Sequence, residues 1–496
     1  MTTYPVTIKN TELLSEHGFI AGEWVEAHSK KTQPVHNPAT QKLIGSIPWM
    51  DQRETKLAIE SASKVLPHWK GHTALERANM LMNWYRLILA NESDLAAILT
   101  SENGKPLAEA KGEIAYAASF IRWFAEEGRR IYGRHVPHQK HGTRIMVIQQ
   151  PIGVTFAITP WNFPAAMVTR KLAPALAAGC PMIVKCSEFT PYTAIALIKL
   201  AEQAGFSKAN GLAGVIQLLT GDAVAIGKEA CTNPIVKKIS LTGSTRVGKI
   251  LMEQSATTLK KLSLELGGNA PFIVFEDADL DKAVAGALIC KYRNSGQTCV
   301  CANRIFVHKK LYKDFIEKLT AAVSQFKVAD GFTPDAQIGP LINDAAFTKV
   351  QHHVSDATAH GAQITTGGKP LAHLGKNFYA PTVLSNVSPD ALLNTEETFG
   401  PVGGIIPFQT EAEVIATANN TPYGLAAYFY SRDVGRVWRV AESIEAGIIG
   451  INEGIISYET APFGGIKESG MGREGATEGI QEYLYTKYLL MGGIDT

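Results

Sequence analysis

The sequence predicts an α/β protein in which a parallel sheet is covered by helices. From Val154 to about Gly454, short apolar runs alternate with helical stretches. The clearest runs are VTFAI, PMIVK, GVIQLLTG and VKKISLTG. Continuous apolar runs are typical of strands buried on both faces, which occur where helices connect parallel strands. A chain of 496 residues also exceeds what one hydrophobic core usually serves, so we expect two or three domains.

The residues before Val154 predict helices first and then a hairpin. In LERANMLMNWYRLILANES, one apolar helical face is expected from the three- and four-residue steps between Ala78, Leu81, Met82, Tyr85, Ile88 and Leu89. Asn103-Gly104 is a helix stop signal, and a second helix is expected from about 107 to 131. The segment 135–149 predicts a hairpin that protrudes from its domain. The last strand-like segment, YLYTKYLLM, is expected to pair with this hairpin or with a neighbouring subunit.

Charge and composition exclude several classes of partner. The net charge is only +2, from 48 basic and 46 acidic residues without a basic block, so nothing indicates nucleic acid or an anionic membrane. The N-terminus lacks the basic start and apolar core of a signal peptide, and no apolar run approaches the ~20 residues that span a bilayer. Six cysteines in so long a chain fit a reducing compartment. We therefore expect a cytoplasmic protein that acts on a small molecule.

A strand followed by a glycine-containing helix start marks a candidate cofactor site. The run VKKISLTG leads into 243–248, GSTRVG, where glycines let the backbone approach and a helix N-terminus offers N–H groups to a pyrophosphate. An ordinary strand-to-helix turn explains these residues equally well. Lys185 and Glu188 follow another strand, where the carboxylate would accept from the ribose of NAD and repel the 2′-phosphate of NADP; a solvated loop pair is the alternative. The literal G-x-G-x-x-G at 470–475 follows no strand, so we interpret it as a glycine-rich loop.

Three segments carry side chains suited to acyl chemistry. Cys299 lies in SGQTCVCANR, and a thiol needs a base to become an effective nucleophile. Glu265 ends the run LEL before two glycines, where partial burial would make it a general base. Asn162 lies in TPWNFP, where two prolines stiffen the loop and hold the amide as an oxyanion donor. For each segment alone a packing thiol, an exposed carboxylate or a local cap is the simpler interpretation; their joint occurrence favours catalysis.

Over essentially its whole length the chain resembles the NAD(P)-dependent aldehyde dehydrogenases. Seven matching segments occur in the family's order: TPWNFP, VKCSEFTP, LTGSTRVG, LELGG, GQTC, EETFGP and PFGGIKESGMGRE. The resemblance implies that Cys299 is the nucleophile, Glu265 the general base and Asn162 the oxyanion donor. It also implies that NAD or NADP is the cofactor, contacted by Thr159, Pro160, Trp161, Lys185, Ser187, Glu188, Gly243, Ser244, Gly248, Leu266, Gly267, Glu397 and Phe399. No metal is implied, and the sequence shows no zinc-finger spacing of cysteines.

The same resemblance implies the aldehyde dehydrogenase fold, with three parts. A Rossmann-like cofactor-binding domain is expected at 1–131 and 150–262, and an α/β catalytic domain at 263–479. Residues 132–149 and 480–496 are expected to form strands, including a protruding hairpin, that join subunits into a homodimer or homotetramer.

Within this family the chain most resembles the succinate-semialdehyde dehydrogenases. The second cysteine in Cys299-Val300-Cys301 is typical of that group. Arg170, Arg293 and Ser457 match the residues that bind the substrate carboxylate, for which guanidinium groups are suited. Without the resemblance, a salt bridge between domains would be the simpler interpretation of each arginine.

Several alternatives remain open at this point. Cys186-Ser187 replaces the family's usual Pro-Ala, so Ser187 could help to hold a phosphate while Glu188 opposes it; we favour NAD. Oxidation could join Cys301 to Cys299 and stop turnover, although so short a loop strains a disulfide. Another acidic aldehyde such as glutarate semialdehyde, a CoA-acylating dehydrogenase, and a non-catalytic protein that retains the fold are the rival functions.

Overall fold

Five parallel strands form the centre of the first sheet, as the alternating pattern predicts. The computed structural model of the protein describes residues 7–494. The eight strands of this sheet are, in spatial order, β19 (Gly470–Met471), β11 (Lys261–Glu265), β10 (Val236–Thr242), β7 (Val154–Ile158), β8 (Met182–Lys185), β9 (Ile216–Leu219), β1 (Gly18–Ile20) and β2 (Glu23–Val25). The strands at both edges run antiparallel to their neighbours. The carboxyl ends of the five central strands therefore meet at one edge, where ligands bind in sheets of this kind.

Helices cover both faces of this sheet, and together they form the first lobe. One face carries α5 (Pro164–Ala178) and α6 (Pro191–Gln203), and over them lie α2 (Ala74–Ala90), α3 (Glu92–Asn103) and α4 (Leu107–Glu127). The other face carries α1 (Gln52–Gly71), α7 (Ala223–Thr232) and α8 (Thr245–Ser255). Along β8 the side chains of Met182 and Val184 pack in the hydrophobic core under α5 and α6, and that of Ile183 packs in the core on the opposite face of the sheet. This is the period-two alternation expected of a strand.

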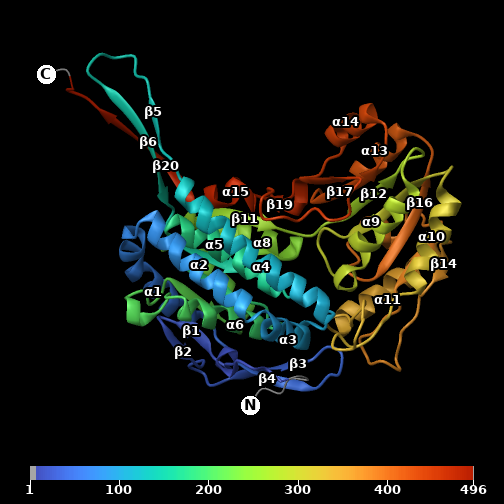
Figure 1. Ribbon diagram of the computed structural model, residues 1–496, viewed down its shortest axis with the longest axis horizontal. Coiled ribbons are helices and arrows are strands. Elements are labelled where there is room, and N and C mark those ends of the chain that lie inside the picture. Colours follow the sequence, from blue (N-terminus) through green and yellow to red (C-terminus); the bar gives the residue numbers. More distant parts are fainter. Residues whose placement is uncertain (1–6, 495–496) are drawn as a thin grey trace.

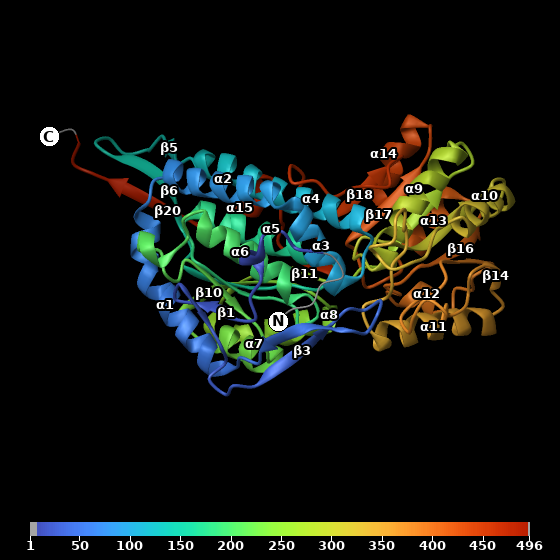
Figure 2. The same ribbon diagram turned by 60° about the horizontal axis from the view of Figure 1, so that its bottom comes forward.

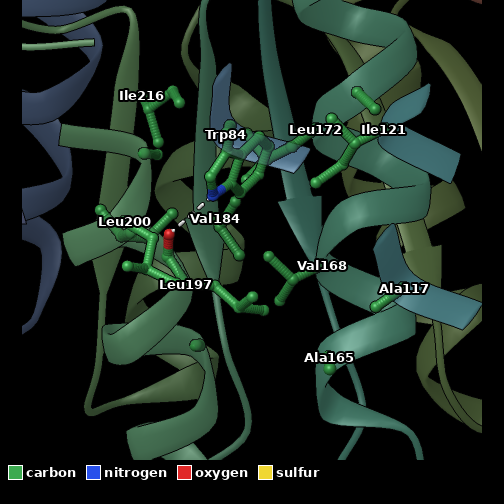
Figure 3. Packing of buried hydrophobic residues seen from close by; sticks show 14 of the residues in the cluster. Trp84, Ala117, Ile121, Ala165, Val168, Leu172, Val184, Leu197, Leu200 and Ile216 are labelled. Carbon is green, nitrogen blue, oxygen red and sulfur yellow. Dashed lines mark hydrogen bonds between the residues drawn. The ribbon is translucent and has the colours of Figure 1, made fainter. Parts of the chain in front are cut away.

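The buried face of α2 is rotated from the predicted one. Ala78, Leu81 and Ile88 are buried as expected, whereas Leu89 is 39% exposed. Trp84, absent from the predicted face, is fully buried, and its indole N–H donates to the carbonyl of Leu197 in α6 at 3.0 Å (Figure 3). The predicted face left out Trp84, although Leu81, Trp84 and Ile88 also follow each other at three- and four-residue steps. A buried tryptophan needs a hydrogen-bond acceptor, which only the tertiary fold supplies.

The expectation that the first third is helical is also wrong in part. Residues 18–48 contain four short strands, of which β3 (Thr32–His36) and β4 (Leu43–Pro48) form a separate two-stranded ribbon. β1 instead extends the first sheet by pairing with β9, which lies almost 200 residues away along the chain. A three-residue strand carries too little periodicity to be found without its partner.

A second lobe is built on a seven-stranded sheet (Figure 2). Its strands are, in order, β14 (Gln363–Thr366), β15 (Thr382–Ser385), β16 (Val402–Phe408), β13 (Ala302–His308), β12 (Ala270–Val274), β17 (Ala426–Tyr430) and β18 (Ile448–Ile451). All are parallel except β14. The helices of this lobe are α9 (Leu280–Tyr292), α10 (Tyr312–Ser324), α11 (Asp344–Ala359), α12 (Leu392–Thr395), α13 (Glu411–Asn419) and α14 (Val434–Ser443). The α/β class with two sheets is thereby confirmed.

Three antiparallel strands project from the first lobe (Figure 1). β5 (Arg134–Val136) and β6 (Arg144–Pro151) form the predicted hairpin, and β20 (Leu484–Met491) pairs with β6 along its whole length. Of the two predicted partners for the last strand, the structure therefore shows the hairpin. β20 exposes Tyr485, Tyr488, Leu490 and Met491 by 40–64% of their surface.

The predicted domain limits stay a prediction. Two strands of the first sheet do not follow these limits. β11 crosses the predicted limit at residue 262, and β19 lies in the first sheet although 470–471 fall within the predicted catalytic domain. Helix α15 (Ala476–Gln481) also contacts α4 and α5 of the first lobe. Residues 1–6 and 495–496, at the ends of the predicted cofactor-binding and oligomerisation segments, lie outside the described residues. Among the described helices, none is long and apolar enough to cross a bilayer.

The packing of Trp84 predicts a large stability difference between the two faces of α2. Trp84→Ala should lower the free energy of unfolding by about 3–5 kcal/mol, because it removes a buried ring and leaves a cavity. The matched control Leu89→Ala, on the exposed face, should change it by less than about 0.5 kcal/mol. Urea unfolding of both variants measures this, and equal losses would contradict the rotated face.

Candidate active site

Cys299 lies in a loop whose backbone is held away from regular structure. The loop follows α9 and the 3₁₀ turn Arg293–Gly296, in which Asn294 and Ser295 have φ of +51° and +56°. A Cβ on Gly296 would lie 2.1 Å from the carbonyl oxygen of Gly400, so glycine is required for this close approach. The Ser295 hydroxyl donates to the Gly339 carbonyl at 2.9 Å. These contacts fix the loop before it presents Cys299.

Cys299 lines two cavities that meet where the two lobes meet. The larger cavity, of about 640 Å³, is lined by Pro160, Trp161, Asn162, Thr242, Gly243, Ser244, Arg246, Leu266, Gly267, Cys299, Ala345, Ala346, Lys349, Glu397, Thr398 and Phe399. The smaller cavity, of about 310 Å³, is lined by Glu109, Gly112, Glu113, Tyr116, Phe163, Met167, Arg170, Thr242, Arg293, Thr298, Cys299, Val300, Ile455, Ser457 and Phe463. A sulfur in this position can contact ligands in both.

Asn162 is joined directly to the cysteine loop. Its side-chain Nδ2 donates to the Gln297 carbonyl at 3.1 Å, and its own carbonyl accepts from Asn294 Nδ2 at 3.0 Å. Its Oδ1 accepts from the N–H of Phe163 at 3.1 Å, which fixes which end of the amide faces the cavity. The loop predicted to hold an oxyanion donor therefore touches the loop that carries Cys299.

Glu265 is a buried carboxyl group without a hydrogen-bond partner. It ends β11, is 2% exposed, and within the described residues neither of its oxygens accepts a hydrogen bond. Burial raises its pKa well above the ordinary value, and the neighbouring Glu474 raises it further. A Cβ on Gly464 would approach Glu265 Oε1 to 2.9 Å, so a glycine leaves room beside the carboxyl group. A buried polar group left unsatisfied in this way is typical of a functional site.

The thiol of Cys299 is neutral in this environment. Burial raises its pKa to about 12, and the negative charge of Glu397 acts in the same direction. Arg170 and Arg293 oppose the increase. At neutral pH a base must therefore accept the thiol proton when the sulfur attacks a substrate.

The two predicted arginines differ in their partners. Arg170 lies 3.6 Å from the Glu474 carboxylate and donates to the Tyr116 hydroxyl. Arg293 stacks over the Phe163 ring at 5.2 Å, and within residues 7–494 its guanidinium takes part in no ion pair. The salt-bridge interpretation thus describes Arg170 and not Arg293, and both arginines line the smaller cavity with Ser457.

The larger cavity has the features that a dinucleotide requires. The Thr242 hydroxyl is buried and has no hydrogen-bond partner in the described part of the chain. At the start of α8, a Cβ on Gly248 would lie 2.6 Å from the Leu266 side chain, so only glycine lets this helix pack so closely on the chain after β11. Arg246 and Lys349 add positive charge to the wall. Free helix N–H groups, an unpaired hydroxyl and cations together suit a pyrophosphate.

Ten predicted residues gather around this larger cavity: Pro160, Trp161, Asn162, Gly243, Ser244, Leu266, Gly267, Cys299, Glu397 and Phe399. Phe399 has φ +55° and meets Trp161 edge to face at 5.5 Å. Glu397 Oε1 accepts from the N–H of Gly268 at 3.1 Å, and burial raises the pKa of Glu397 to about 7.

The remaining predicted cofactor residues do not line this cavity: Thr159, Lys185, Ser187, Glu188 and Gly248. Thr159 and Lys185 stand at the carboxyl ends of the neighbouring strands β7 and β8. Lys185 Nζ donates to Glu188 Oε2 at 3.2 Å, so the two residues form a pair, but Lys185 is buried at the end of β8 and is not a solvated loop residue. Glu188 lines a separate cavity of about 470 Å³.

Two further sequence interpretations concern cysteines and glycines. The Cys301 thiol is buried and donates to the Lys291 carbonyl at 3.1 Å, and it lines neither of the two cavities that Cys299 lines. Cys299 and Cys301 are both free, so an oxidative link between them stays a prediction. The glycine-rich run at 470–475 forms β19 and the start of α15, not a strand-to-helix crossover. No cluster of metal-ligating side chains occurs in the described part of the chain.

Sequence reasoning missed one side of the smaller cavity. Glu109, Gly112, Glu113 and Tyr116 recur at three- and four-residue steps along α4, so they share one helical face. This spacing was present in the sequence. The spacing alone does not indicate a site, because only the tertiary fold brings this face of α4 beside Cys299.

Comparison with known proteins agrees with this architecture. A family model described as the aldehyde dehydrogenase family matches residues 24–489. The glutarate-semialdehyde dehydrogenase of Pseudomonas aeruginosa is 55% identical over 98% of this chain and 100% of that protein. The succinate-semialdehyde dehydrogenase [NADP(+)] of Escherichia coli is 54% identical over 98% and 99%. The crystal structure of succinate-semialdehyde dehydrogenase from Burkholderia pseudomallei, 56% identical, covers 98% of this chain and 100% of that one with a TM-score of 0.96. The chain belongs to the aldehyde dehydrogenase family.

Proposed function

We propose that the protein oxidises succinate semialdehyde to succinate with NAD(P), through a thioester on Cys299. The observation that carries this proposal is the position of Cys299, whose side chain lines both the larger cavity and the smaller, arginine-containing one. A reaction that needs one atom to contact a substrate beside a dinucleotide requires such a position.

In the first half-reaction, the sulfur of Cys299 attacks the aldehyde carbon. The thiol proton passes to solvent, so the attacking species is the thiolate. Glu265, whose carboxyl group is buried, unpartnered and close enough to influence the pKa of the thiol, acts in the second half-reaction. The carbonyl oxygen gains the negative charge, which the Asn162 amide and the backbone N–H of Cys299 stabilise. Bound NAD(P) would accept the hydride that the substrate carbon then loses.

In the second half-reaction, the carboxylate form of Glu265 takes a proton from water and afterwards gives it to the departing sulfur. The resulting hydroxide attacks the thioester carbon, the C–S bond breaks, and succinate and the free thiol are released. A raised pKa suits Glu265 to this role, because a weakly acidic carboxyl group is a stronger base once it is deprotonated.

The smaller cavity supports an aldehyde that carries an anion at its far end. Arg293 has no ion-pair partner among the described residues, so a substrate carboxylate would supply the missing charge. The Ser457 hydroxyl and Arg170 line the same cavity. A fixed guanidinium binds a carboxylate strongly and leaves an uncharged aldehyde without compensation for the buried charge.

The alternatives concern mainly the substrate. Relatives of similar identity are named for glutarate semialdehyde and for succinate semialdehyde, so a one-carbon-longer substrate is the nearest rival. A CoA-acylating reaction is disfavoured because a base for hydrolysis, Glu265, is present. A non-catalytic role is disfavoured by the joint presence of Cys299, Asn162 and Glu265.

We propose that the protein uses either NAD or NADP, forms a homodimer or homotetramer, and lies in the cytoplasm. Glu188 favours NAD, but its carboxylate is held by Lys185 and the Escherichia coli relative is named for NADP(+), so either coenzyme fits. The exposed apolar edge of β20 is suited to pairing with another copy, in a homodimer or homotetramer. Six free cysteines fit the cytoplasm.

Substitutions at the proposed nucleophile and base should separate the two half-reactions. Cys299→Ala should abolish turnover. Glu265→Gln should give a burst of reduced cofactor followed by turnover slowed about 10²-fold, because the thioester forms but water is not activated. Stopped-flow absorbance at 340 nm measures both phases. Substantial turnover by Cys299→Ala, or an unchanged steady state for Glu265→Gln, would contradict the roles assigned.

Arg293→Met should remove the preference for an anionic aldehyde. kcat/KM for succinate semialdehyde should fall about 10- to 100-fold, as expected when a charged hydrogen bond of about 1.5–3 kcal/mol is lost. kcat/KM for butanal, which has the same chain length without the carboxylate, should change little. A parallel loss for both aldehydes would show that Arg293 is structural, and running glutarate semialdehyde beside them tests the rival substrate.

The raised pKa of Cys299 predicts how its alkylation depends on pH. In the cofactor-free enzyme, the thiolate fraction should rise about tenfold per pH unit below the pKa of about 12. The rate of inactivation by iodoacetamide should therefore increase steadily between about pH 7 and 10 without reaching a plateau. Cys301→Ala should follow the same curve. A plateau near neutral pH would mean that the thiol is already ionised there.

A further inference from the structure

Three charged residues at four-residue steps lie beside the active site without a role in the chemistry proposed above. They are Lys105, two residues before α4, and Glu109 and Glu113 in the first two turns of that helix. The side chains of Lys105 and Glu113 are 0% and 1% exposed. Burial of such charges is costly unless they are paired and hydrogen bonded, so the contacts they make must offset a large desolvation penalty.

Lys105 is bonded to the loop that carries Asn162. Its ammonium donates to the Asn162 carbonyl at 2.7 Å and to Glu113 Oε2 at 2.5 Å. It also lies 3.9 Å from the centre of the Phe163 ring. One buried cation thus contacts two successive residues of this loop.

Glu113 extends the same contact to the next helix. Its second oxygen, Oε1, accepts from the N–H of Ala165 at 2.9 Å and, more weakly, from that of Ala166 at 3.4 Å. Both amides belong to the first turn of α5, where backbone N–H groups lack partners in the helix. Lys105 and Glu113 therefore fix the chain from residue 162 to 166.

Glu109 makes the equivalent contact to the cysteine loop. Its Oε2 accepts from the N–H of Asn294 at 2.8 Å, and Asn294 Nδ2 in turn donates to the carbonyls of Asn162 and Gln297. Residues four apart lie on the same face of a helix. One face of α4 therefore holds both loops that must meet for the reaction.

We propose that Lys105 and Glu113 are positioning residues that set the Asn162 amide at the distance from Cys299 at which it can bind an oxyanion. This inference rests on the oxyanion role given to Asn162 in the proposed function. An oxyanion donor is effective only when it already points to the place where charge develops, within about half an ångström, so the backbone that carries it must be fixed.

The test replaces the charged pair by an uncharged pair of similar size, Lys105→Met with Glu113→Gln. The glutamine oxygen can still accept from the Ala165 N–H, so the start of α5 is retained and no unpaired charge is buried. Aldehyde oxidation and the cofactor-free hydrolysis of p-nitrophenyl acetate should both lose about tenfold in kcat, because both form an oxyanion. Alkylation of Cys299 by iodoacetamide should change less than about twofold, since that displacement forms none.

A double-mutant cycle separates positioning from a general structural role. Asn162→Ala alone should lower kcat for both reactions about 10²-fold. Adding the uncharged pair to Asn162→Ala should cost less than about twofold more, because the residue being positioned is already absent. Losses that multiply would overturn the positioning role and leave the proposed function intact. Full turnover by Asn162→Ala would instead overturn the oxyanion role in the proposed function.

Two measurements keep the result interpretable if the pair variant is less stable. Lys111→Met, on the exposed side of α4, should leave turnover and alkylation unchanged. Equal losses in esterase turnover and in alkylation would show that the cysteine loop itself has moved, and would overturn the proposal.

Discussion

The site depends on the docking of two loops, one from each lobe, through hydrogen bonds to peptide carbonyls. Asn162 Nδ2 and Asn294 Nδ2 both donate to the Gln297 carbonyl, and Asn294 also donates to the carbonyl of Asn162. These bonds join the end of β7 to the turn before Cys299. If they were lost, the thiol would still be present, but the cavity that contains the arginines and the cavity suited to a dinucleotide would no longer share one sulfur atom.

Sequence reasoning predicted the parts of this arrangement that depend on local pattern. The strands β7, β8, β9 and β10 were identified because apolar runs of four to seven residues alternate with helices. Cys299, Asn162 and Glu265 were identified from their flanking glycines and prolines and from the family resemblance, and the structure places Cys299 and Asn162 at one cavity. Local pattern and catalytic geometry agree here because loops at the carboxyl ends of parallel strands converge.

What the sequence could not predict depends on partners that are distant along the chain. β1 has only three residues and is defined by its pairing with β9. Trp84 is buried because the Leu197 carbonyl accepts from its indole. Nothing in the local pattern around Lys105 and Glu113 indicates their roles, which depend on contacts with Asn162 and Ala165 in another part of the chain. Charged residues are usually exposed, because burying a charge costs free energy. Only tertiary contacts that pair and hydrogen bond the charge offset this cost.

The charges around the smaller cavity explain why an anionic aldehyde suits it. Glu474 is one carboxylate shared by two cations, Lys171 and Arg170, while Arg293 is in no ion pair within residues 7–494. Burial raises the pKa of Glu265 and of Glu109, which shifts both carboxyl groups toward their neutral forms. Positive charge therefore exceeds negative charge at this end of the cavity. A carboxylate on the substrate would neutralise this excess positive charge, whereas an uncharged aldehyde would leave a buried guanidinium without a counter-charge.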